Sequence, residues 1–307
     1  MKKHVPNYFI LAILALVMSV ATSCKSRGGD SCDHAENLIR DEIENPMTED
    51  FINDDIDDVV VGDVVVEAIY EEVKLLHTIT SSNGFVKKFE YDNRNRIVKI
   101  HTYNGQGERV ETQTLSYSGN NLVKYDFGLI LNFRQTGNRV TGGWDRSTLE
   151  SEVLASAQSG LTHAIDLNSE GLPIKYVMTN GFDLTVKNFT IQDGNIIRYS
   201  SQYSYSNPTY DQDIHYEEAM FVLELSHDNQ KTPFANCATP KWWWLFYDVS
   251  ENVNRNNVVD ARSENIRMRS TYEFDSGGFP IKQTDFEGGR ETSVIFSYIV
   301  VKRRVTL

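Results

Sequence analysis

Tyr91-Asp92-Asn93-Arg94-Asn95-Arg96-Ile97-Val98-Lys99 is the stretch that decides the fold, because its pattern returns at residues 167–175 and 274–282. In each copy an apolar residue precedes an Asp or Asn, whose side chain can accept bonds from the backbone amides ahead of it and start a turn. Three residues further on stands an Asn or Gly, the types that tolerate a positive φ. The pattern predicts a tight hairpin turn, here called turn A. Its defining pairs are Asp92 with Asn95, Asn168 with Gly171, and Asp275 with Gly278.

Two further turn signals keep step with turn A. Turn B begins 12 residues after it in all three copies, at Asn104-Gly105, Asn180-Gly181 and Glu287-Gly288 (104 − 92, 180 − 168, 287 − 275). Asn-Gly is a strong signal for a short hairpin. Turn C, at Gly119-Asn120 and Gly194-Asn195, follows turn A by 27 and 26 residues (119 − 92, 194 − 168). The agreement predicts an internal repeat of about four strands.

The body of the chain, from residue 64 to residue 307, alternates apolar and polar residues between these turns. Enrichment in β-branched and aromatic residues at strand length favours strands. Short connections place sequence neighbours side by side, so we expect an all-β antiparallel meander. It should form one large twisted or curled sheet of about eleven strands. A membrane-spanning barrel is the rival, but it needs strands of about 9–11 residues with an apolar outer band.

Two segments interrupt the repeat. Residues 145–160 could form a short helix that begins with a capping box of Ser147 and Glu150, or an irregular strand. A larger insertion, over about residues 206–262, separates the second and third repeats.

The first 23 residues predict a secretion signal. Lys2 and Lys3 precede an apolar core over residues 9–20, and three small residues then lead to Cys24. This layout resembles the bacterial lipobox, in which cleavage leaves the cysteine as the lipidated first residue. We therefore predict a lipid anchor on Cys24, which binds the protein to a membrane without spanning it.

Residues 24–63 follow as an acidic tether: residues 30–63 hold 13 Asp or Glu and one basic residue, Arg40. The whole chain has a formal charge of −13. Such acidity argues against nucleic acid and anionic lipid headgroups as main partners.

The sequence contains no recognisable catalytic or metal-binding constellation. Its seven histidines lack zinc-site spacing, and His215 beside Glu217 is more typical of a surface pair. No glycine-rich phosphate loop and no nucleophile elbow is present. We therefore predict no cofactor, no metal and no enzyme. A hydrolase with two distant carboxylates stays an alternative, because such partners are far apart in sequence.

Two cysteines and an aromatic run stand out from the repeat. Cys32 and Cys237 could form a disulfide in an oxidising compartment, or stay free thiols. Trp242-Trp243-Trp244 could pack in the core or form an exposed platform for a sugar or peptide. We take Trp242, Trp244 and Phe246 as the candidate contact residues.

The alternation of Tyr-Asp-x-x-Gly-like and Ser-Gly-Asn-Asn-Leu-like hairpins resembles the YD, or RHS-type, repeat. Together with the lipobox and the stretch 228–234, it is similar to a family of uncharacterised lipoproteins from Bacteroidota. The resemblance covers the signal and most of residues 73–307, although Leu167-Asn168 replaces the Tyr-Asp pair. It implies an all-β sheet, and it brings no activity or catalytic residue.

The sequence thus predicts a lipid-anchored protein of the cell envelope, in the outer membrane, that acts as a binding or interaction module. A glycan or another envelope protein would be the partner. A purely structural envelope component and a carbohydrate-active hydrolase are the alternatives.

Overall fold

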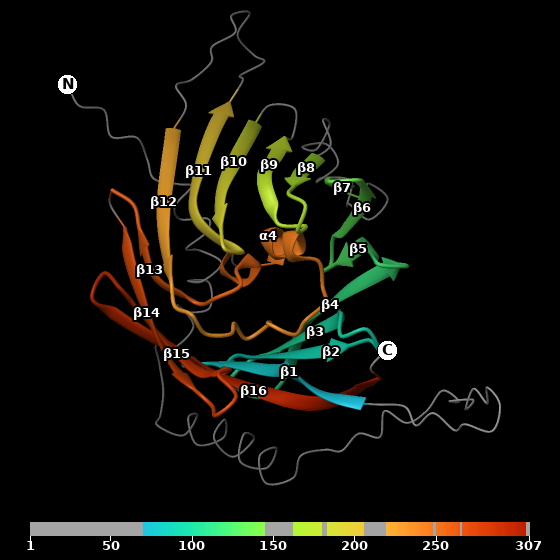
Figure 1. Cartoon of the computed structure of the whole chain (residues 1–307), viewed down its shortest axis with the longest axis vertical. Coiled ribbons are helices and arrows are strands. Elements are labelled where there is room, and N and C mark those ends of the chain that lie inside the picture. Colours follow the sequence, from blue (N-terminus) through green and yellow to red (C-terminus); the bar gives the residue numbers. More distant parts are fainter. Residues whose placement is uncertain are drawn as a thin grey trace, which may run out of the picture.

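A computed structural model describes residues 70–144, 162–179, 183–205, 219–247, 250–264 and 266–304 (Figure 1). The strands are, in chain order, β1 (Tyr70–Ser81), β2 (Val86–Tyr91), β3 (Ile97–Tyr103), β4 (Arg109–Ser118), β5 (Asn121–Asp126), β6 (Ile130–Thr136), β7 (Arg139–Trp144), β8 (Thr162–Leu167), β9 (Pro173–Thr179), β10 (Asp183–Gln192), β11 (Asn195–Tyr205), β12 (Ala219–His227), β13 (Val258–Arg262), β14 (Arg267–Phe274), β15 (Pro280–Glu287) and β16 (Arg290–Arg304). Three short helical turns are η2 (Lys241–Trp243), α4 (Trp244–Tyr247) and η3 (Ser250–Val253).

The strands form a closed antiparallel barrel. Each strand pairs with the next along the chain, and β1 pairs with β16 from Tyr70 opposite Arg304 to Ser81 opposite Val294. The prediction of one large twisted or curled sheet of about eleven strands was therefore wrong: the described chain has sixteen strands, and they form a closed barrel. Closure gives the two edge strands hydrogen-bond partners, which an open sheet would leave exposed. The prediction of an all-β meander of consecutive hairpins was correct.

The three copies of turn A have the same geometry. The Asp92 Oδ1 atom accepts hydrogen bonds from the amides of Arg94 and Arg96, and Asn168 and Asp275 each accept the corresponding pair. The third residue beyond each has a positive φ: 60° at Asn95, 75° at Gly171 and 75° at Gly278. These turns follow β2, β8 and β14, so all of them lie at the same end of the barrel.

The first copy of turn B has a different geometry from the one its Asn-Gly sequence indicates, whereas in the third copy Gly288 and Gly289 both have a positive φ, as in a two-residue hairpin loop. In the first copy Gly107, not Gly105, has the positive φ, and Asn104 Oδ1 accepts from the amides of Gln106 and Glu108. This turn therefore repeats the design of turn A at the opposite end. The second copy, at residues 180–181, lies outside the described residues.

The insertion is an enlarged turn A. After β12, Asp228 Oδ1 accepts from the amides of Gln230 and Asn257, and the Asp228 amide donates to the Asn257 carbonyl. These are the bonds that Asp92 makes with Arg94 and Arg96, so Asn257 takes the place of the fifth residue of the turn. The inserted loop thus runs from residue 228 to residue 257. The predicted insertion, over about residues 206–262, also takes in β12, β13 and residues outside the described ones. The predicted helix at 145–160 and His215 lie outside the described residues.

The insertion fills the barrel, and we call it the plug. Figure 1 shows its α4 turn inside the ring of strands. Trp242, Trp243 and Trp244 are 2%, 0% and 1% exposed, respectively. Their rings meet aromatic residues of the wall and of the plug itself, with centroid distances of 5.0 Å from Trp242 to Phe133 and 5.5 Å from Trp243 to Tyr125. The apolar core therefore lies inside the barrel.

The outer surface carries charged side chains together with exposed apolar ones. On β14, Met268 packs towards the core, whereas Arg267 and Arg269 lie outside beside Asp260 at 3.2 and 3.7 Å. Exposed apolar side chains stand among such charges: Phe286 lies opposite Arg269 in the sheet.

Candidate functional site

The plug is fixed to the barrel by paired backbone and side-chain contacts. The amide of Ile97 donates to Thr239 Oγ1 at 2.8 Å, and the amide of Ile196 donates to Asn254 Oδ1 at 2.6 Å. Thr239 and Asn254 are 3% and 0% exposed, so each plug side chain satisfies a buried amide that follows a hairpin turn. The plug therefore completes the hydrogen bonding of the wall at two separate places.

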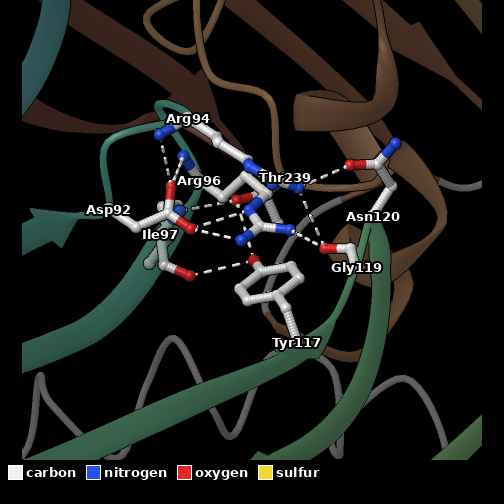
Figure 2. A network of polar contacts seen from close by, with 8 residues as sticks. All are labelled: Asp92, Arg94, Arg96, Ile97, Tyr117, Gly119, Asn120 and Thr239. Atoms are coloured by element: carbon white, nitrogen blue, oxygen red, sulfur yellow. Dashed lines mark hydrogen bonds and ion pairs between the residues drawn. The ribbon is translucent and has the colours of Figure 1, made fainter. Parts of the chain in front are cut away.

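A polar network lies under the first of these contacts (Figure 2). Arg96 donates to Asp92 Oδ2 at 2.7 Å and to the Gly119 carbonyl at 2.6 Å, which joins turn A to turn C of the first repeat. Its guanidinium lies 4.1 Å from the centre of the Tyr117 ring, and the Tyr117 hydroxyl donates to the Ile97 carbonyl. Burial raises the pKa of Asp92, but the hydrogen bonds from Arg96 outweigh it and hold the pKa below its usual value. The Asp92 carboxylate, the Arg96 guanidinium and the Tyr117 hydroxyl each have a hydrogen-bond partner in the protein, so the network is structural.

A second polar group, on the inner wall of β8, β9 and β10, is different because several of its atoms lack partners. We call His163, Tyr176, Thr185 and Lys187 the inner-wall cluster. In the sheet register Lys187 lies opposite Tyr176, whereas Thr185 and His163 both lie opposite Met178 on its two sides. All four side chains therefore share the inner face of the barrel.

Tyr176 holds the inner-wall cluster together. Its hydroxyl and His163 Nδ1 are hydrogen bonded at 2.8 Å, and the two rings stack with centroids 5.9 Å apart. The Lys187 ammonium lies 5.9 Å from the centre of the same ring. Phe246 of the plug closes one side, with its ring 5.0 Å from that of His163 and 5.9 Å from that of Tyr176.

Burial determines the charge state of the cluster. It lowers the pKa of His163 to about 4, so this side chain is neutral at physiological pH. It also lowers the pKa of Lys187 and raises that of Tyr176. Among the described residues, no carboxylate forms an ion pair with Lys187. The cluster therefore presents one cation that no described acidic side chain neutralises.

Two hollows flank the plug. One, of about 510 Å³, lies beside Asp193, Asn195, His227 and Arg255 and has a mainly polar lining. The other, of about 320 Å³, is lined by Glu170, Cys237, Lys241 and Trp242 among others. Burial raises the pKa of the Cys237 thiol and lowers that of Lys241.

The structure answers part of the sequence-based site prediction. Trp242 and Trp244 are buried in the core, so the exposed aromatic platform was wrong: consecutive Trp side chains pack around a helical turn that the wall encloses. Phe246, by contrast, contacts the inner-wall cluster. Cys24 and Cys32 lie outside the described residues, so the lipid anchor and the disulfide with Cys237 stay predictions. Within the part of the chain that is described, no group of three His, Cys, Asp or Glu side chains could hold a metal ion.

His163, Thr185 and Lys187 were not recognised from the sequence. The alternation of Thr185, Lys187 and Phe189 places a lysine on the same strand face as a large apolar residue, and this was the available signal. It shows that the three share a face, but not that this face lies inside a barrel.

Comparisons with known proteins give little further information. No family model matches the chain, and no curated protein matches it. Among solved structures, a porin-like protein from Bacteroides uniformis ATCC 8492 aligns with 75% of this chain and 96% of its own, at 8% sequence identity and a TM-score of 0.31. A TM-score of this size does not establish a common fold. Among the described residues, no helix is long and apolar enough to cross a membrane.

Proposed function

We propose that the protein is a lipid-anchored binding module of the outer membrane, whose barrel stands in water and holds a small ligand at the inner-wall cluster. The observation that carries this proposal is the Lys187 ammonium on the inner wall without an acidic partner among the described residues. A desolvated, unpaired charge costs free energy unless something compensates it. Proteins that retain such a group commonly use it at a functional site.

The distribution of charge supports a barrel that stands in water. A barrel in lipid needs an apolar outer band, and an Arg or Lys at the middle of the bilayer costs about 2–4 kcal/mol. Here Arg267, Arg269 and Glu273 lie on the outer face of one strand, and Glu90 with Lys99 lies on that of another pair. Membrane attachment would then depend on Cys24. The resemblance to YD-repeat lipoproteins agrees with this role and stays a prediction.

The filled interior argues against a role as an open pore. Large aromatic side chains of the plug pack against the wall, and Trp243 is fully buried. A plug joined to the wall by buried hydrogen bonds is an integral part of the core. This favours a module that retains a ligand over a channel that conducts one.

The anchor is tested with Cys24→Ala in the mature chain, secreted behind a signal that a general signal peptidase removes. We expect the wild type to incorporate labelled palmitate and to fractionate with the outer membrane. The variant should lose the label and appear, folded, in the soluble periplasmic fraction. A Cys24→Ala protein that stays in the membrane after alkaline extraction would show that the barrel itself is inserted, and would refute the proposal.

The binding role is tested with the same soluble protein. Native mass spectrometry of the freshly purified chain should show a small molecule that dissociates on denaturation. A mass equal to that of the bare polypeptide, together with no binding in a screen of small metabolites, would favour a purely structural envelope component.

A further inference from the structure

The Lys187 side chain has an aromatic neighbour but no anionic partner among the described residues. In the register of β9, β10 and β11 it lies between Tyr176 and Ser201, and its ammonium is close to the Tyr176 ring. A contact between an ammonium and an aromatic ring compensates only part of the cost of removing an ammonium from water. An anion beside Lys187 would supply the missing compensation.

Two further unpartnered polar atoms lie on the same inner face. Thr185 is two residues before Lys187 on β10 and is 2% exposed, yet its Oγ1 atom has no hydrogen-bond partner. His163 is 6% exposed, and its Nε2 atom likewise has none. When the Tyr176 hydroxyl donates to Nδ1, the neutral imidazole carries its proton on Nε2 and becomes a donor. A threonine hydroxyl, an imidazole N–H and an ammonium are all donors, and a carboxylate accepts from each.

The remaining surroundings are apolar and aromatic. Phe246 of the plug lies beside His163 and Tyr176, and Met178 packs against the core between the strands of the cluster. Further along the wall, the Phe189 and Tyr199 rings lie 6.0 Å apart. Such walls suit the uncharged body of a ligand, and aromatic pairs add affinity beyond the apolar area they bury.

We propose, building on the binding role above, that the inner-wall cluster binds a small monocarboxylic acid with an apolar or aromatic body. Lys187 and Thr185 hold the carboxylate, and the rings of Tyr176 and Phe246 contact the body. The single cation matches one negative charge, so a dianionic phosphate would leave a buried charge uncompensated. A cationic ligand would be repelled by Lys187.

The test uses two water-soluble probes of similar shape, 3-phenylpropanoate and 3-phenylpropan-1-ol, with the mature chain carrying Cys24→Ala. Binding is measured by calorimetry and by saturation-transfer NMR at pH 7. We expect the acid to bind at least tenfold more tightly than the alcohol. Lys187→Met should abolish this preference while leaving alcohol binding within about twofold. Thr185→Val should weaken acid binding by about ten- to a hundredfold, as expected for loss of one hydrogen bond to a charged group.

Lys175→Met is the matched control, because Lys175 lies exposed on the neighbouring strand β9 and faces outward, opposite Asp166. It should leave the preference for the acid unchanged. Lys187→Met should also fold, because it replaces a half-buried lysine with an apolar side chain of similar length. Lys187→Arg gives a second variant that keeps the charge.

Three outcomes overturn the assignment. Equal binding of acid and alcohol to the wild type would refute the carboxylate class but leave a binding module in place. A preference for the acid that survives in Lys187→Met would remove Lys187 from the site. No binding of either probe, in a protein that also carries no copurified ligand, would refute this proposal and the binding role together.

Discussion

Protonation of His163 should make the barrel unusually sensitive to acid. The resulting loss in the free energy of unfolding follows from the pKa of this side chain in the folded protein. The pKa of this buried side chain is about 4 in the folded protein, against 6.5 for an ordinary histidine. Because the folded state disfavours the charged form, the unfolded chain takes up the proton first as the pH falls. The stability from this group is thus fully present above pH 6.5 and is lost between about pH 6.5 and 4. Linkage gives a loss of about 2 kcal/mol at pH 5 and about 3 kcal/mol at pH 4.

The measurement is urea denaturation of wild type and His163→Phe between pH 7 and pH 4, followed by tryptophan fluorescence. All other ionisable groups are the same in the two proteins, so their contributions cancel in the difference. His163→Phe loses the bond to Tyr176 and should be less stable at pH 7. Between pH 7 and pH 4 the difference in free energy of unfolding between the two proteins should change by about 3 kcal/mol in favour of the variant. A gap that does not change with pH would refute the argument that burial keeps His163 neutral.

The remaining predictions concern the plug and the turns. Trp243→Ala removes a fully buried ring and should lower the free energy of unfolding by about 3–5 kcal/mol in urea denaturation; a loss under about 1 kcal/mol would show that the plug does not share the core. Thr239→Val leaves the Ile97 amide without its acceptor and should cost about 1–3 kcal/mol, whereas Thr239→Ser should recover most of it; equal losses would assign the effect to packing. Gly171→Ala should cost about 1–2 kcal/mol from backbone strain alone, because φ is 75° and a Cβ atom there meets nothing within 4 Å. Gly105→Ala, where φ is not positive, is its control, and thermal denaturation should show little change.

The sequence predicted the features that depend on neighbouring residues. An Asp that accepts bonds from two amides just ahead of it, followed by a left-handed residue, is a local device, and all three copies of turn A were identified. The strand count was too low because the hairpins at Gly128 and Gly137 fall outside the regular spacing of turns A, B and C. The first copy of turn B was misread, because the residue with positive φ there is Gly107 and not Gly105, which follows Asn104 directly.

Closure of the barrel depends on contacts that local patterns do not contain. Tyr70 and Arg304 are far apart in the chain, and the sequence of neither strand indicates that the two strands pair. The candidate site has the same difficulty. A lysine that alternates with apolar residues could face water or the interior, and only closure of the barrel places the half-buried Lys187 on the inner wall.

The plug shows that one loop position of this scaffold accepts a large addition without disturbing the strands on either side. In turn A one residue stands between the two amides that the Asp or Asn side chain binds, whereas 26 residues (231–256) stand between Gln230 and Asn257. The same pair of hydrogen bonds is present at Asp92, Asn168 and Asp275. These three turns are therefore equivalent insertion sites at the same end of the barrel. New segments grafted there would begin and end at atoms already fixed in space, so the barrel could be given additional recognition loops while its register is kept.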